Sequence, residues 1–231
     1  MRTSILFLGL IFAGALAGAA QDVDDYFPAQ VGTTWEYELT LKRGEQAHAI
    51  RYATKAVRSE TLEGVECVVF ETTSGSKLLR TAWYEVAGSA VREWQTSARD
   101  GAVVQKLREV PPPPEGEEQA APPSRGRLLF DSAQRQPGTT WSWTSAAGDA
   151  EGTITFLGPT ELENPALGRV RCLQIEERGE FRRGGKTARQ VRTLWFAPKL
   201  GLVREVSTIT LPDGRETTSE ATLLSKPKVD Q

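Results

Sequence analysis

The chain of 231 residues carries 28 Lys and Arg against 30 Asp and Glu, which gives a formal net charge of −2. So small a balance provides no long-range attraction for polyanions, and we expect no nucleic-acid partner. One His and two Cys are too few ligands for a zinc site, and no Gly-rich phosphate loop precedes a helix, so the sequence predicts neither a metal nor another cofactor.

The N-terminus has the features of a secretory signal peptide. Arg2 precedes an apolar run over residues 5–17, and residues 18–20 are the small residues that signal peptidases read. The run is shorter than the roughly 20 residues that a membrane span needs. We therefore predict a signal peptide over residues 1–20, no transmembrane span after its cleavage, and a periplasmic or extracellular protein.

The rest of the chain contains an internal repeat. The string GTTWEY at residues 32–37 returns as GTTWSW at 138–143, and VECV at 65–68 returns as VRCL at 170–173. The spacing between equivalent positions is nearly constant and grows only near the hairpin tip at 181–187, where insertions are tolerated. This pattern indicates duplication of a folded unit.

The repeat sets the expected organisation of the mature chain. We predict an N-terminal β repeat over residues 21–110, a linker over 111–126, a C-terminal β repeat over 127–226 and a tail over 227–231. The linker opens with consecutive prolines followed by acidic residues, a composition typical of extended chain without a core. It is interpreted as a spacer or as a binding segment for a partner.

Within each repeat the hydrophobic pattern has a period of two. Trp35, Tyr37 and Leu39 share one face of the first predicted strand, and Glu36 and Glu38 share the other. Glycine-containing turns and the lack of a sustained helical stripe predict five or six strands in each repeat. The expected fold is all-β, with two tandem antiparallel meanders that form a pseudo-symmetric barrel or sandwich, or two linked β modules.

The two cysteines, Cys67 and Cys172, occupy equivalent positions in the repeats. Export would permit a disulfide, and residues related by a pseudo-two-fold axis touch if they lie near that axis. The sequence leaves open a Cys67–Cys172 disulfide and two separate buried thiols.

The sequence offers little support for catalysis. His48 is the single histidine and lies in a polar stretch, which is unsuited to a nucleophile–histidine pair. Glu93 and Glu205 are equivalent in the repeat, which favours a role in the shared fold over a role in one active site. We expect no enzyme, and the alternative is a hydrolase that acts on glycan or cell-wall material through paired carboxylates.

The aromatic residues supply the candidates for a ligand site. Most of the six Trp lie at equivalent positions and are expected in the core. Trp94 and Trp143 have no Trp at the equivalent position, and Tyr37 is the counterpart of Trp143. These three residues, Tyr37, Trp94 and Trp143, are the candidates to line a cavity.

Three segments resemble a known group of proteins. They are YFP at residues 26–28, VGTTWEY at 31–37 and WFAPKLGLV at 195–203. They resemble the YFP…GxxWxY start and the late WFAPxxGLV segment of exported bacterial all-β proteins of unknown function. The resemblance covers most of the mature chain and implies an envelope protein loosely similar to periplasmic lipoprotein carriers.

The sequence therefore predicts a non-catalytic exported envelope protein with a structural or binding role. If the sheets curve around a cavity, the aromatic strand face that occurs in both repeats predicts an apolar ligand such as a lipid or acyl chain. The expected partners are a hydrophobic small molecule or another envelope protein. A partner-binding module that uses the Pro-rich linker is the remaining alternative.

Overall fold

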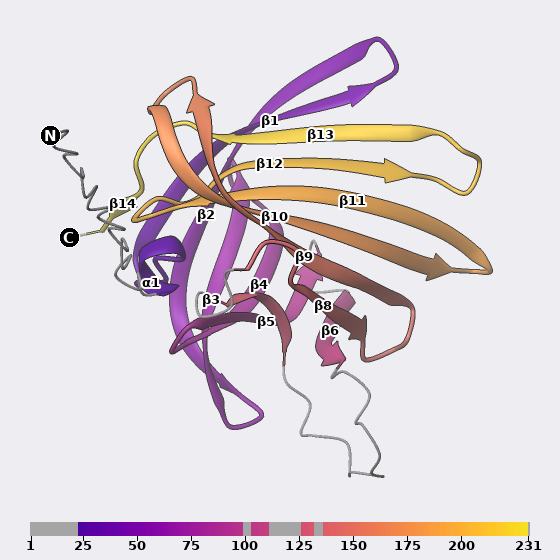
Figure 1. Ribbon diagram of the computed structural model, residues 1–231, viewed down its shortest axis with the longest axis horizontal. Helices are drawn as coiled ribbons and strands as arrows, with labels where there is room; N and C mark the ends of the chain where they lie inside the picture. Colours follow the sequence, from indigo (N-terminus) through magenta and orange to yellow (C-terminus); the bar gives the residue numbers. More distant parts are fainter. Residues whose placement is uncertain (1–22, 99–102, 111–125, 132–135, 231) are drawn as a thin grey trace, which may run out of the picture.

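The computed structural model describes residues 23–98, 103–110, 126–131 and 136–230 (Figure 1). The predicted signal peptide lies outside the described residues, as does the predicted linker apart from Gly126. None of the helices in the described ranges has both the length and the apolar character needed to cross a membrane.

Strands dominate the described residues, as the period of two predicts. The one helix among them is the four-residue α1 (Val23–Tyr26). The strands are β1 (Thr33–Arg43), β2 (Gln46–Leu62), β3 (Val65–Ser74), β4 (Lys77–Ala87), β5 (Ala90–Ala98), β6 (Val103–Val110), β7 (Arg127–Asp131), β8 (Thr140–Ser145), β9 (Ala150–Asn164), β10 (Gly168–Arg183), β11 (Lys186–Ala197), β12 (Gly201–Thr210), β13 (Glu216–Leu223) and β14 (Lys228–Val229).

The strands form one closed antiparallel barrel. Neighbours in the chain pair with each other from β1 to β6 and from β8 to β13, and β6 pairs with β8. The barrel closes where β13 pairs with β1, from Tyr37 opposite Leu223 to Lys42 opposite Thr218. Twelve strands make up the barrel, while β7 and β14 add to β5 and β1. The predicted all-β barrel is confirmed, and both halves of the chain contribute to a single sheet.

Matched residues of the two predicted repeats lie on strands of the same rank in each half. Cys67 lies on β3 and Cys172 on β10, while Trp83 lies on β4 and Trp195 on β11. Each half supplies six strands to the barrel, and in Figure 1 the strands of the N-terminal half run from indigo to magenta and those of the C-terminal half from red-brown through orange to yellow. The duplication itself stays a prediction.

The strand β7 departs from the sequence assignment. The sequence places residues 127–131 at the start of the C-terminal repeat, whereas β7 pairs with β5 of the other half. Four consecutive side chains of β7 are buried, from Arg127 to Phe130. A strand covered on both faces does not alternate, so its sequence carries no period of two.

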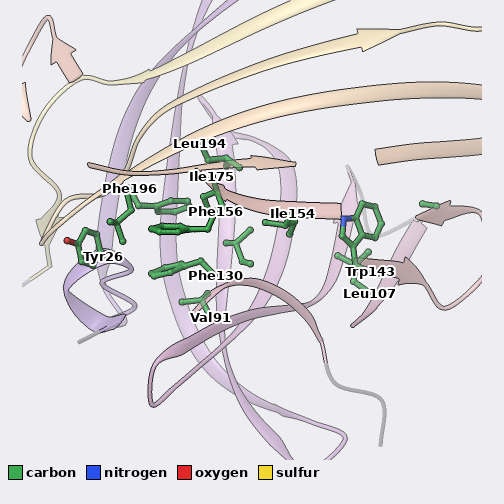
Figure 2. Close-up of a cluster of buried hydrophobic side chains, with 13 residues drawn as sticks. Tyr26, Val91, Leu107, Phe130, Trp143, Ile154, Phe156, Ile175, Leu194 and Phe196 are labelled. Atoms are coloured by element: carbon green, nitrogen blue, oxygen red, sulfur yellow. The ribbon is translucent and has the colours of Figure 1, made fainter. Parts of the chain in front are cut away.

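One part of the barrel interior is filled by side chains that we call the core cluster. Figure 2 shows that this cluster extends from Tyr26 on α1 to Trp143 on β8. At the α1 end the ring of Phe130 stacks on Phe196, with 5.8 Å between ring centroids, and meets Tyr26 edge-on at 6.3 Å. The labelled members are Tyr26, Val91, Leu107, Phe130, Trp143, Ile154, Phe156, Ile175, Leu194 and Phe196.

The segment after α1 packs against both halves of the barrel. The ring of Phe27 lies 5.1 Å from Tyr84 and 5.5 Å from Phe70, both in the N-terminal half, and 6.3 Å from Phe196 in the other half. The backbone N–H of Lys199 donates a hydrogen bond to the carbonyl oxygen of Asp25. The N-terminal segment thus joins the two halves at one end of the barrel.

Candidate ligand cavity

The barrel interior also contains a cavity of about 340 Å³. Its walls come from β1, β2, β3 and β4 on the N-terminal side, and from β11, β12 and β13 on the C-terminal side, with Leu129 of β7 between them. Small-molecule sites range from about 300 to 1,000 Å³ and are mostly apolar. The cavity therefore has the size of a small ligand site.

Aromatic rings form much of the cavity wall. Tyr37 and Tyr52 stack with 5.0 Å between ring centroids, and the ring of Trp35 lies 5.7 Å from Phe70. The aromatic face that the sequence predicts on the first strand points into this cavity. The aromatic lining residues are Phe27, Trp35, Tyr37, Tyr52, Phe70, Tyr84 and Phe196.

The turn between β11 and β12 is fixed to the first strand of the barrel. Trp35 Nε1 donates to the Leu200 carbonyl oxygen at 2.8 Å, and the Tyr37 hydroxyl donates to the Leu202 carbonyl oxygen at 2.9 Å. Gly201 lies between them with φ of +75°, and a Cβ there would lie 3.3 Å from Trp35 Nε1. Only glycine fits this close approach without strain, which accounts for the glycine in the WFAPKLGLV segment.

One side of the cavity is charged. A row of alternating charges runs through the barrel interior, and we call it the charge chain. Arg127 binds Glu93 with one terminal nitrogen and Glu177 with the other. Its members are, in order, Arg80, Glu93, Arg127, Glu177, Arg192 and Glu205.

The charge chain connects the two halves of the molecule. Arg80 on β4 binds Glu93 on β5, and Arg192 on β11 lies next to Glu205 on β12. Arg192 Nε lies 3.4 Å from Oε2 of Glu177 and 3.4 Å from Oε1 of Glu205. The equivalence of Glu93 and Glu205 in the sequence thus corresponds to two Arg–Glu pairs, one in each half.

Two members of the charge chain, Glu93 and Arg192, have pKa values shifted in favour of their charged forms. Burial alone would raise the pKa of Glu93, but the guanidinium groups of Arg127 and Arg80 outweigh it and lower the pKa to about 2. Burial would likewise lower the pKa of Arg192, while the carboxylates of Glu205 and Glu177 raise it above its ordinary value. Glu93 and Arg192 therefore stay charged at neutral pH.

The aromatic hydroxyls of the cavity stay protonated. Burial raises the pKa of Tyr52 above its ordinary value, and the charge of Glu205 raises it further. Burial also raises the pKa of Tyr37. Both tyrosines therefore offer neutral hydroxyl groups.

Comparison with known proteins supports the fold. No protein-family model matches the chain, and no curated protein does so. A solved structure of a predicted exported protein with a YmcC-like fold, from Bacteroides fragilis, aligns with a TM-score of 0.50 at 14% identity, over 88% of this chain and 98% of that one. The fold is similar to a YmcC-like one. A predicted lipoprotein from Parabacteroides distasonis aligns at 16% identity with a TM-score of 0.45, over 90% of this chain and 100% of that one.

Of the three predicted lining residues, Tyr37 is the one that lines the cavity of about 340 Å³. Trp143 belongs to the core cluster, is 2% exposed, and has the Arg127 guanidinium 4.8 Å from its ring centroid. Trp94 donates from Nε1 to Glu85 at 3.0 Å and lines only a hollow of about 50 Å³.

The structure keeps the two cysteines apart. Both are buried free thiols. Cys67 packs with Val69 and Trp83, whereas Cys172 belongs to a different hydrophobic cluster that includes Val203. Of the two arrangements that the sequence leaves open, the structure shows separate thiols. The one histidine, His48, is exposed on β2.

The charge chain, whose members Arg80, Arg192 and Glu205 line the cavity, is the part of the site that the sequence analysis did not predict. Arg80 and Arg192 each precede a matched tryptophan by the same interval, Trp83 in one half and Trp195 in the other. That recurrence is the signal that could have identified them. It was masked because a charged residue in an alternating strand is normally assigned to the solvent face.

Proposed function

We propose that the protein is a non-catalytic exported binding protein that holds a lipid or another molecule with an acyl chain inside its barrel. The observation that carries this proposal is the cavity of about 340 Å³ lined by aromatic and aliphatic side chains. Burial of an alkyl chain against such a wall contributes roughly 0.8 kcal/mol per methylene group.

The charged residues of the cavity support binding better than catalysis. A general acid or base works best with a pKa near the operating pH. The two arginines that bind Glu93 hold its pKa at about 2, far from neutrality. The carboxylates are thus tied up in ion pairs, which argues against the alternative of a glycan hydrolase.

Export is supported by two separate observations. The N-terminus reads as a signal peptide, and the similar Bacteroides fragilis structure belongs to a predicted exported protein. We place the protein in the cell envelope or outside the cell on this basis.

The proposal is tested by native mass spectrometry of the mature protein, followed by organic extraction and by titration with acyl amphiphiles. We expect one acyl-bearing molecule per chain. Ala82→Trp places a large ring in the cavity wall and should abolish binding, whereas Ala49→Trp on the exposed part of β2 should leave it unchanged. A protein that neither carries nor takes up any acyl compound would contradict the proposal.

A further inference from the structure

The charge chain presents an uneven surface to the cavity. Its middle members are buried, with side-chain exposures of 1% for Glu93, 6% for Arg127 and 5% for Glu177. The side chains of the outer members are more exposed, at 38% for Arg80, 16% for Arg192 and 26% for Glu205, and all three line the cavity. A ligand in the cavity therefore meets two guanidinium groups and one carboxylate, and the buried carboxylate of Glu93 behind Arg80 balances the second guanidinium.

Arg192 and Glu205 have hydrogen-bonding capacity that the protein does not use. Arg192 Nε is buried 3.4 Å from one oxygen of each of two carboxylates, yet it donates a hydrogen bond to neither of them. Within the described part of the chain, the Glu205 carboxylate accepts no side-chain hydrogen bond, and its ion-pair partner is Arg192. Arg80, by contrast, donates to Glu93, Thr96 and Tyr84. The Arg192 guanidinium and the Glu205 carboxylate thus lie side by side in one cavity wall.

The charge balance decides which headgroup fits this wall. The charge chain contains three guanidinium groups and three carboxylates, so its formal charges cancel. An anion placed at Arg192 also lies beside Glu205, and a cation placed at Glu205 also lies beside Arg192. Each arrangement adds a like-charge repulsion between partly buried groups, which salt screens less than it screens exposed ones.

A headgroup without net charge avoids both repulsions. An acceptor on the headgroup can receive a hydrogen bond from Arg192, and a neighbouring N–H or O–H can donate to Glu205. Hydrogen bonds to charged partners are stronger than those between neutral groups, and leaving such groups unpaired on ligand entry costs free energy.

We infer that the cavity selects amphiphiles whose headgroup has no net charge and joins a hydrogen-bond acceptor to an N–H or O–H donor. This inference rests on the proposed function and specifies its ligand class. A zwitterionic phosphoethanolamine head and an uncharged glycerol ester share this chemistry. The tail lies against the aromatic wall formed by Phe27, Trp35 and Phe70.

The test compares four probes that carry the tail of lauric acid or its amine counterpart. They are laurate, dodecylammonium, monolaurin and lauroyl lysophosphatidylethanolamine, titrated into the mature protein by calorimetry at neutral pH. We expect monolaurin or the lysophospholipid to bind at least about tenfold more tightly than either ion. Tighter binding of monolaurin would identify the headgroup as uncharged, and tighter binding of the lysophospholipid would identify it as zwitterionic.

The outcomes separate this inference from the proposed function. Equal binding of all four probes, or tighter binding of laurate or dodecylammonium, would overturn the headgroup selection while acyl binding stands. Failure of all four probes to bind would overturn both.

Variants test the charge balance directly. Glu205→Gln leaves a net positive wall, and we expect the affinity for laurate relative to monolaurin to rise by about tenfold. Arg192→Gln should produce the opposite shift, towards dodecylammonium. Glu220→Gln is the matched control, because Glu220 pairs with Arg204 at 2.9 Å and does not line the cavity. An unchanged ratio in both cavity variants would overturn the inference.

Discussion

Trp35 donates a hydrogen bond from its indole Nε1 to the carbonyl oxygen of Leu200, at 2.8 Å and across 165 residues of sequence. This bond fixes the first strand of the barrel to the turn between β11 and β12. The hydroxyl of Tyr37 makes the neighbouring bond to Leu202, across the same sequence separation. The two bonds hold one cavity wall to the other.

Loss of the Tyr37 hydroxyl should destabilise the barrel. Tyr37→Phe removes the donor to the Leu202 carbonyl, and we expect the free energy of unfolding to fall by about 1 kcal/mol. Tyr52→Phe is the matched control, because Tyr52 stacks on Tyr37 and its hydroxyl has no hydrogen-bond partner among the described residues. Urea denaturation measures both, and equal effects would contradict the role of the Tyr37 bond.

Removal of Arg127 should be among the most damaging changes in the protein. Arg127→Met leaves the carboxylates of Glu93 and Glu177 buried without their shared partner. We expect the free energy of unfolding to fall by about 3–5 kcal/mol, the usual cost of breaking a buried pair on one side. Chemical denaturation followed by tryptophan fluorescence gives the value.

A surface arginine provides the comparison for Arg127. Arg182 pairs with Glu151 at an exposed hairpin, where both side chains are about half exposed. We expect Arg182→Gln to change the free energy of unfolding by less than about 1 kcal/mol, because water screens such pairs. Similar losses for the two variants would show that the charge chain contributes no more than a surface pair.

The charge chain should make the protein sensitive to acid. The folded-state pKa of Glu93 is about 2, against an ordinary value of 4.5. Above pH 4.5 both states are ionised and the stabilisation is complete. As the pH falls from 4.5 towards 2 the unfolded state takes up the proton first, so about 3 kcal/mol is lost.

The contribution of Glu93 is isolated by a variant. Glu93→Gln cannot ionise, so we expect its stability to fall less steeply than that of the wild type below pH 4.5. Denaturation curves at a series of pH values measure the slopes. Parallel slopes for the two proteins would assign the acid sensitivity to other carboxylates.

The cysteines should titrate as two free and slowly reacting thiols. Burial raises the pKa of Cys67 and of Cys172 to about 11, and the thiolate is the reactive form. We expect almost no reaction with a thiol reagent in the folded protein at neutral pH, and two equivalents after unfolding without a reductant. An unfolded protein with no free thiol would show that the two residues form a disulfide.

The antiparallel meander within each half could be predicted from the sequence because its signals are local. Alternation places Trp35 and Tyr37 on the inner face, and the turn glycines separate the strands. The buried strand Arg127–Asp131 could not be assigned in this way, since a strand covered on both faces has no alternation. Its pairing with β5 depends on contacts distant in sequence.

The charge chain was not predicted from the sequence for a related reason. Glu93 follows Arg92 in the chain, but its partners Arg80 and Arg127 come from other strands. An isolated charged residue in an alternating strand normally faces solvent, and nothing local distinguishes Glu93. Trp143 was a candidate for the cavity because it breaks the pattern of matched tryptophans, yet that exception reflects packing in the core cluster.

The closure of the barrel between β1 and β13 bears on how the protein acquires its structure. The pairs from Tyr37 with Leu223 to Lys42 with Thr218 join the earliest barrel strand to the latest. An emerging polypeptide therefore leaves one edge of β1 without its final neighbour until nearly all of the chain has been synthesised. Such distant pairings form slowly and favour aggregation in the meantime, so a newly made chain would benefit from a chaperone that shields this first strand.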